Sequence, residues 1–185
     1  MRRWMAFHCL IVEKAVVNKE FHDGDFDLAR RKHFTMLLTN KMKRCMTRHT
    51  GRDHVFRVWV DPIASRYSKA DEVVEIISAS TLRKELPGRR VDVKVSTWDS
   101  HDADAIQVCD LLLGACVSAW NAKGSSPRRE AVQKRVAECL GWEHLRWDTY
   151  RTERKFNIWM FHDPVRDQRK ATSQKVTLKH GATSA

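Results

Sequence analysis

Short segments rich in β-branched residues alternate along this chain with longer segments in which apolar residues recur every three or four positions. The first pattern is typical of strands and the second of helices. The predicted order is β-α-β-α-β-α-α-β, which indicates an α/β layered fold whose sheet is at least partly parallel. The predicted strands are 4–17, 55–60, 90–98 and 155–162, and the predicted helices are 25–48, 68–86, 103–123 and 126–140.

Each predicted helix has a face or an end that the sequence marks. Ser68-Lys69-Ala70-Asp71 resembles a capping box, and Ser126-Pro127 offers an N-cap with a first-turn proline. The helix at 103–123 is apolar almost all round, so we expect it in the core. The helix at 25–48 is expected to be amphipathic with a basic outer face, and its inward stripe is predicted to be Phe26, Ala29, His33, Phe34, Leu37, Leu38, Met42 and Cys45.

The length of 185 residues favours one domain. With 42% hydrophobic and 31% charged residues, the composition is that of a globular chain with a core. We expect a single α/β domain over residues 1–164. Residues 165–185 are polar, basic and without periodicity, and are expected to form a flexible tail.

Thirty-four Lys and Arg residues face 23 Asp and Glu residues, for a net charge of +11 with neutral histidines. This excess suits a polyanionic partner, most often nucleic acid, although many basic proteins have no such partner. The predicted contacts to a phosphate backbone are Lys41, Lys43, Arg44, Arg128 and Arg129. Of the seven tryptophans, Trp142 and Trp147 are expected to be the exposed pair available for stacking on bases.

Several classes of protein are disfavoured. The five cysteines contain no Cys-x-x-Cys pair, which argues against a disulfide framework or a cysteine zinc site and favours the reducing cytoplasm. His8 interrupts the apolar run after Arg2 and Arg3, so we expect no signal peptide, and no other run is long enough for a membrane helix. The chain lacks the glycine-rich loops and the Gly-x-Ser-x-Gly motif of nucleotide-dependent enzymes and serine hydrolases.

Three carboxylates could hold a divalent cation. Asp61 directly follows the strand at 55–60, and Asp99 directly follows Trp98. Because function gathers at the carboxyl ends of parallel strands, we expect both at one cleft, with Asp110 from the apolar helix beside them. Hard cations such as Mg²⁺ and Mn²⁺ take oxygen ligands and support phosphoryl displacement. Taken singly, each acid also has a structural interpretation, as a turn residue, an N-cap or a salt-bridge partner. Of the nine histidines, His101 alone is kept as a candidate proton shuttle, with an exposed loop residue as the alternative.

One stretch resembles a known family. Asp99-Ser100-His101 followed by the helix Gln107-Val108-Cys109-Asp110-Leu111-Leu112-Leu113-Gly114-Ala115 is similar to the signature of the domain-of-unknown-function 3800 family. Val58-Trp59-Val60-Asp61 and Lys155-Phe156-Asn157-Ile158-Trp159 resemble two strands of that family, and the similarity spans about residues 7–161. His101 stands where the family has lysine, and Cys109 where it has alanine.

The resemblance implies an RNase H-like mixed sheet flanked by helices, and a divalent-metal-dependent nuclease of bacterial or phage type. Asp61, Asp99 and Asp110 would be the Mg²⁺ or Mn²⁺ ligands, and Gln107 would orient a ligand or a phosphate oxygen. The family's opening strand carries Asp-Glu-Ser, which this chain lacks, so we expect an N-terminally incomplete member with an exposed sheet edge that invites self-association. A non-catalytic nucleic-acid-binding module and an inactive remnant are the alternatives.

Overall fold

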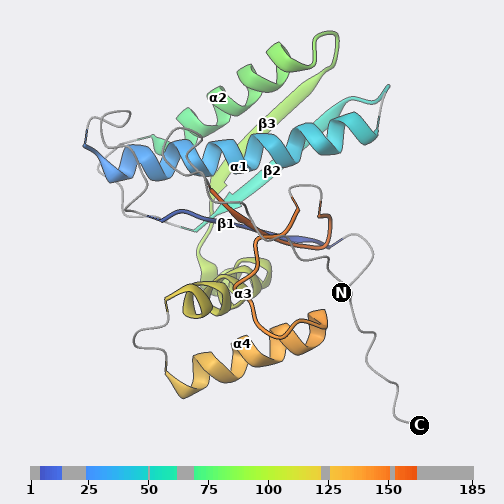
Figure 1. Cartoon of the computed structure of the whole chain (residues 1–185). Coiled ribbons are helices and arrows are strands. Elements are labelled where there is room, and N and C mark those ends of the chain that lie inside the picture. The colour runs from blue at the N-terminus through green and yellow to red at the C-terminus, as the bar shows by residue number, and fades with distance from the viewer. Residues whose placement is uncertain are drawn as a thin grey trace. The chain divides into compact units, whose positions relative to one another are not determined.

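The computed structural model describes residues 5–13, 24–49, 51–61, 69–121, 126–150 and 153–161 of the chain. The order of elements along the chain agrees with the predicted one, and the fold is a mixed α/β fold (Figure 1). The elements are β1 (Phe7–Ile11), α1 (Phe26–Arg48), β2 (His54–Val60), α2 (Ala70–Glu85), β3 (Val91–Thr97), a short 3-10 turn η3 (Ser100–Asp102), α3 (Asp104–Trp120), α4 (Pro127–Leu140) and β4 (Phe156–Met160).

The internal contacts of the chain fall into two compact units. Unit 1 comprises Met1–Val17 and Gln107–Ala185, and unit 2 comprises Asn18–Ile106, so the division falls within the first turn of α3. Each unit has its own hydrophobic core. The single domain expected over residues 1–164 stays a prediction, and the predicted tail at 165–185 lies outside the described residues. Within the described ranges, no helix is long and apolar enough to cross a membrane.

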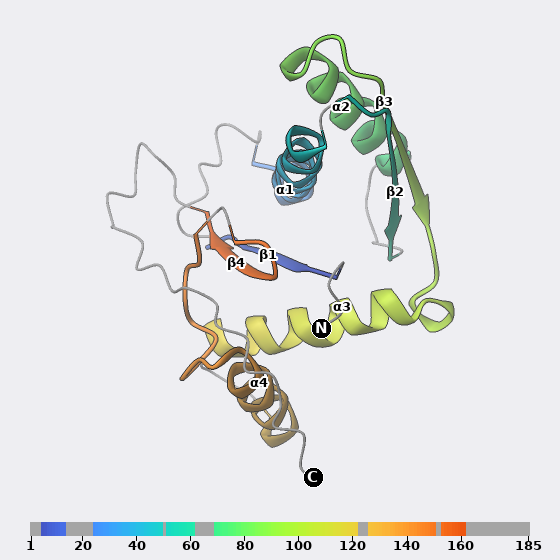
Figure 2. The same cartoon turned by 90° about the vertical axis from the view of Figure 1, so that its right-hand side faces the viewer.

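Unit 2 is built around the parallel pair β2–β3, in which His54 faces Val91 and Val60 faces Thr97. Two parallel strands need a crossover connection, and α2 lies within the one that joins them. Helices α1 and α2 lie beside this pair (Figure 2). They supply the rest of the core, which contains Met42, Met46, Ala79, Leu82, Val91 and Val93. Glu75 of α2 also accepts a hydrogen bond from the backbone N–H of Val95 at 2.9 Å, which ties α2 to β3.

Unit 1 is built around the parallel pair β1–β4, in which Phe7 faces Phe156 and Ile11 faces Met160. The rings of Phe7 and Phe156 lie 4.8 Å apart, and Trp142 meets Phe156 edge-on at 5.9 Å. Helices α3 and α4 complete this core. Within the described part of the chain each of the four strands pairs with one neighbour, so the RNase H-like sheet and the edge-driven self-association stay predictions.

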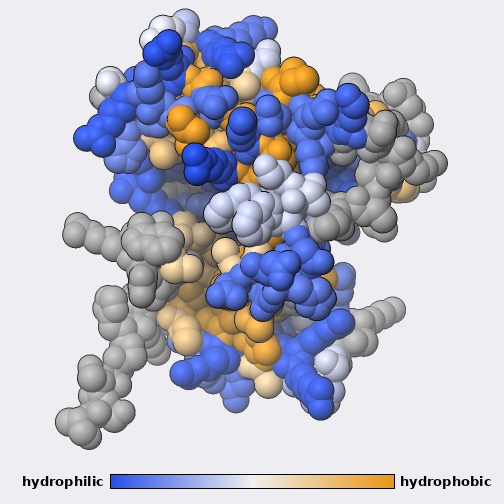
Figure 3. All heavy atoms as spheres, turned by 180° about the vertical axis from the view of Figure 1, so that it is seen from behind, coloured by the Kyte–Doolittle hydropathy of each residue, from blue (hydrophilic) through white to orange (hydrophobic). Residues whose placement is uncertain are grey.

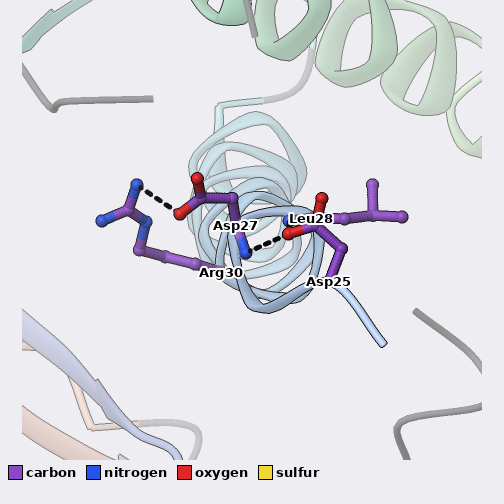
Figure 4. A network of polar contacts seen from close by, with 4 residues as sticks. All are labelled: Asp25, Asp27, Leu28 and Arg30. Atoms are coloured by element: carbon purple, nitrogen blue, oxygen red, sulfur yellow. Dashed lines mark hydrogen bonds and ion pairs between the residues drawn. The ribbon is translucent and has the colours of Figure 1, made fainter. Parts of the chain in front are cut away.

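The helix ends confirm one predicted cap and correct another. Ser126 caps α4 through its hydroxyl, which accepts from the Arg129 N–H at 3.4 Å. At α1, the Asp25 carboxylate accepts from the backbone N–H groups of Asp27 at 2.8 Å and Leu28 at 3.4 Å (Figure 4). The predicted capping box at 68–71 is wrong, because α2 starts after Lys69, which is left-handed and makes no side-chain cap.

The inward face of α1 also differs from the predicted stripe. Phe26, Phe34 and Cys45 are exposed, while Thr35 and Thr39 are buried beside Ala29, Met42 and Met46. The Thr35 hydroxyl donates to the Arg31 carbonyl at 2.8 Å, so the helix backbone satisfies it. The number of apolar residues on a face of α1 therefore does not determine which face is buried. The buried face is the one that packs against α2 and the β2–β3 sheet.

Helix α3 is less buried than its apolar sequence predicts. Ala115, Cys116 and Ala119 form its buried stripe, but Leu111 and Val108 are about half exposed, and Leu113 and Val117 are exposed as well. Apolar surface is visible in Figure 3 in the part of the view where α3 lies. The expectation of a helix that lies wholly in the core is wrong, because one side of α3 packs on the core of unit 1, where Leu112 and Trp120 lie beside the small residues.

Candidate nucleic-acid interface

The β2–β3 sheet has one covered face and one open face. Burial alternates along both strands, so Phe56, Val58, Val91, Val93 and Val95 face the helices. The intervening residues form the open face of unit 2: Val55, Arg57 and Trp59 on β2, and Asp92, Lys94 and Ser96 on β3. A parallel sheet is usually covered on both faces, so a face left open is the unusual feature of this unit.

Two tryptophans stand on this open face. Trp59 is 52% exposed and Trp98, which follows β3, is 45% exposed. Their ring centroids lie 5.4 Å apart with the planes tilted by 31°. The backbone N–H of Trp98 donates to the Val60 carbonyl at 2.9 Å, which continues the ladder and fixes the position of the second ring. A pair of large exposed rings held by a ladder is a preformed stacking surface.

Two cations flank the rings on the same face. The parallel register sets Arg57 directly opposite Lys94, and both side chains are exposed. Neither makes an ion pair with another residue in the described ranges. Like charges opposite each other on neighbouring strands are unfavourable, so an anion that binds both would relieve their repulsion. Asp92 lies near the amino-terminal end of β3, opposite Val55 and away from the tryptophans.

The two strand-end carboxylates lie at one edge of the sheet. Val60 and Thr97 are partners at the carboxyl ends of β2 and β3. Asp61 directly follows Val60, and Asp99 lies two residues after Thr97. Asp61 is half-buried, whereas Asp99 is exposed and accepts a hydrogen bond from the His101 N–H at 2.9 Å. Asp99 thus caps η3, which was the structural alternative for this residue. His101 itself is exposed.

The third predicted ligand lies in the other unit. Asp110 and Gln107 are both exposed on α3 in unit 1. The nearby Cys109 thiol has a raised pKa because of its partial burial and the Asp110 carboxylate. No group of three metal-ligating side chains is found among the described residues, and a common cleft for Asp61, Asp99 and Asp110 stays a prediction.

The basic residues predicted to contact phosphate are divided between the units. Lys41, Lys43 and Arg44 are partly exposed on α1 in unit 2, and Lys43 pairs with Glu85 at 2.5 Å. Arg128 and Arg129 are exposed in the first turn of α4 in unit 1. The helix in each case holds them at the surface, but Lys43 already has a protein carboxylate as partner.

The tryptophans expected to be exposed are not the exposed ones. Trp142 is buried against Phe156, and Trp147 packs on the same core and stacks on His144. Trp59 and Trp98 are the open pair instead. The alternation of Val55, Arg57 and Trp59 with Phe56 and Val58 carries this information, because residues two apart on a strand share a face.

The chain was also compared with known proteins. Comparison with protein-family models, with curated proteins and with solved structures finds no match to any of them.

Proposed function

We propose that the chain binds single-stranded nucleic acid across the open face of the β2–β3 sheet. The observation that carries this proposal is the exposed Trp59–Trp98 pair, held 5.4 Å apart beside the Arg57–Lys94 pair. Aromatic rings that stack on bases, combined with cations that follow the backbone, are the two components of single-strand recognition. The net charge of +11 favours the same class of partner.

The geometry favours a single strand over a duplex. Bases in a duplex are already stacked on each other, so their faces are closed to protein side chains, whereas an unpaired base can lie on an indole ring. Every base has such a face, so stacking on the two indole rings does not distinguish one base from another. The proposed binding is therefore tolerant of sequence, with Arg57 and Lys94 contacting phosphates next to the stacked bases.

The test is binding of a fluorescently labelled oligothymidine and of a duplex of the same length, followed by anisotropy. Trp59→Ala and Trp98→Ala should each weaken single-strand binding by about 1–3 kcal/mol, as expected for one lost base stack. Val55→Ala is the matched control, because Val55 is exposed on the same face but lies away from the rings. Equal affinity of the wild type and both tryptophan variants would refute the proposal.

The salt dependence tests the cations separately. Each phosphate contact to a single strand contributes about 0.7 to the slope of log K against log salt. Arg57→Ala and Lys94→Ala should each reduce that slope by about this amount, while the tryptophan variants lower affinity with little change of slope. A wild-type slope near zero would show that the protein does not contact the phosphate backbone of the nucleic acid.

A second candidate function is metal-dependent phosphodiester cleavage, which rests on the resemblance to the domain-of-unknown-function 3800 family. The observation that favours it is the register, which brings Asp61 and Asp99 to the same edge of the sheet. Carboxylate oxygens suit Mg²⁺ and Mn²⁺, which would supply Lewis-acid activation of a phosphate at this edge. The resemblance adds Asp110 as a third ligand and Gln107 as the residue that orients a phosphate oxygen, and both belong to unit 1.

Cleavage and binding can be separated by experiment. Asp61→Asn, Asp99→Asn and Asp110→Asn should abolish Mg²⁺- or Mn²⁺-dependent cleavage of the labelled strand and leave binding in EDTA unchanged. The matched control is Asp92→Asn, an exposed acid at the opposite end of β3 from Asp99. Binding without cleavage at any metal concentration would leave the binding module as the function.

A further inference from the structure

Two thiols meet in the core of unit 1. Cys9 is the central residue of β1 and Cys116 lies on the buried stripe of α3, and both are almost completely buried. They are neighbours in that core, and each shifts the pKa of the other. Both belong to one cluster with Ala115, Ala119 and Ile158, and β1 is held against β4 by its ladder.

The two sulfurs are not equivalent. The neighbouring Cys116 thiol lowers the pKa of Cys9, against the opposing effect of burial. The same contact, together with burial, raises the pKa of Cys116 far above its ordinary value. Cys9 is therefore the sulfur that ionises first, and Cys116 is the thiol that holds its proton. A cysteine with a lowered pKa next to a second cysteine is a feature that this pair shares with reversible redox pairs, whereas its burial is not.

We propose that Cys9 and Cys116 form a reversible disulfide that joins β1 to α3 when the protein meets a peroxide. In the first step the Cys9 thiolate attacks one peroxide oxygen, the O–O bond breaks, and Cys9 becomes a sulfenic acid while the other oxygen leaves as hydroxide or, with a proton, as water. In the second step the Cys116 sulfur attacks the Cys9 sulfur, the S–S bond forms, and the S–O bond breaks with release of water. Two thiols and one peroxide thus give one disulfide and two waters.

Burial sets the order in which the five cysteines react. All five are free, and Cys45, Cys109 and Cys139 are exposed. Peroxide reaches the buried pair only when β1 moves away from α3. The buried pair therefore reacts more slowly than the three exposed thiols. The bond then closes a long loop of chain between residues 9 and 116, which restricts the opening that admitted the oxidant.

The experiment uses the full chain with Cys45→Ser, Cys109→Ser and Cys139→Ser, which retains only the buried pair. The folded protein is treated with hydrogen peroxide, unfolded in the presence of N-ethylmaleimide, and mapped by peptide mass spectrometry without reductant. We expect a peptide in which Cys9 is linked to Cys116, with the mass of the two thiol peptides less two hydrogens and with no maleimide on either cysteine. Dithiothreitol should convert it back to the two separate peptides.

Two controls keep the outcome decisive. Cys116→Ala, added to the same background, should leave Cys9 as a sulfenic acid that a dimedone probe captures, since no resolving thiol remains. The wild-type chain, alkylated on its exposed thiols before oxidation, gives the same linked peptide and guards against misfolding of the variants. Recovery of Cys9 and Cys116 as maleimide adducts after peroxide, in both the triple variant and the alkylated wild type, would overturn the proposal.

Discussion

The two units of this protein each contain two parallel strands, but they bury them differently. In β4 of unit 1, Phe156, Asn157 and Ile158 are buried in succession, so both faces of the strand are covered. In β2 of unit 2 the burial alternates at every residue, so one face is open. The comparison shows that strands of similar length and pairing can serve either as a core or as a surface that carries side chains for a ligand.

The difference is reflected in how polar residues are used. Asn157 is fully buried, and its amide donates to the Thr149 hydroxyl at 2.7 Å and to the Tyr150 carbonyl at 3.1 Å. On the open face of unit 2, Arg57 and Lys94 have no such partners in the described ranges. Polar groups in unit 1 thus stabilise the fold, and those on the open face are available to bind.

The largest effect should come from removing a side chain from the sheet of unit 1. Ile158→Ala should lower the free energy of unfolding by about 2–5 kcal/mol, because Ile158 has no exposed surface and its removal leaves a cavity. Val55→Ala on the open face of unit 2 should change it by less than about 0.5 kcal/mol. Urea unfolding curves of both variants test the contrast, and equal effects would contradict it.

A smaller loss is expected when the buried amide is removed. Asn157→Ala deprives the Thr149 hydroxyl and the Tyr150 carbonyl of a donor, which should cost about 1–3 kcal/mol. Ser96→Ala, on the open face of β3, is the matched polar deletion and should be nearly neutral. A loss from Ser96→Ala as large as that from Asn157→Ala would show that the open face is not open in solution.

The N-cap of α1 should contribute about 1 kcal/mol to unit 2. Asp25→Ala removes the acceptor for two backbone N–H groups at the start of the helix, and the expected range is about 0.5–2 kcal/mol. Asp27→Ala removes the ion pair with Arg30 at 3.2 Å near the surface, and should cost less. Thermal unfolding followed by circular dichroism ranks the two, and the reverse ranking would contradict the capping role of Asp25 (Figure 4).

The smallest effect concerns the cations on α1. The triple variant Lys41→Ala, Lys43→Ala and Arg44→Ala should flatten the salt slope of nucleic-acid binding, by up to about 0.7 for each cation in contact with a single-strand phosphate. Because Lys43 is already paired with Glu85, we expect a smaller change than Arg57→Ala and Lys94→Ala give together. Anisotropy at several salt concentrations measures both. A larger change from the α1 variant would move the interface from the sheet to α1.

The sequence by itself determined the type and order of the elements. Strand alternation, helical periodicity and the cap at Ser126 are local, so they predict β2, β3, α1, α3 and α4 to within a few residues. The same local patterns also contain the open face of β2, on which Trp59 lies, whereas we expected Trp142 and Trp147 to be the exposed tryptophans. The strand-end positions of Asp61 and Asp99 follow equally from residues close in sequence.

The tertiary structure decided which face of each element is buried and which distant residues meet. Thr35 and Thr39 lie inward on α1 and Phe34 outward, because burial depends on where α2 and the sheet lie and not on the hydropathy of α1 alone. The contact between Cys9 and Cys116 and the opposition of Arg57 and Lys94 likewise depend on packing and register between segments far apart in sequence. Periodicity fixes how residues repeat along an element, whereas long-range packing fixes which of those residues face the core.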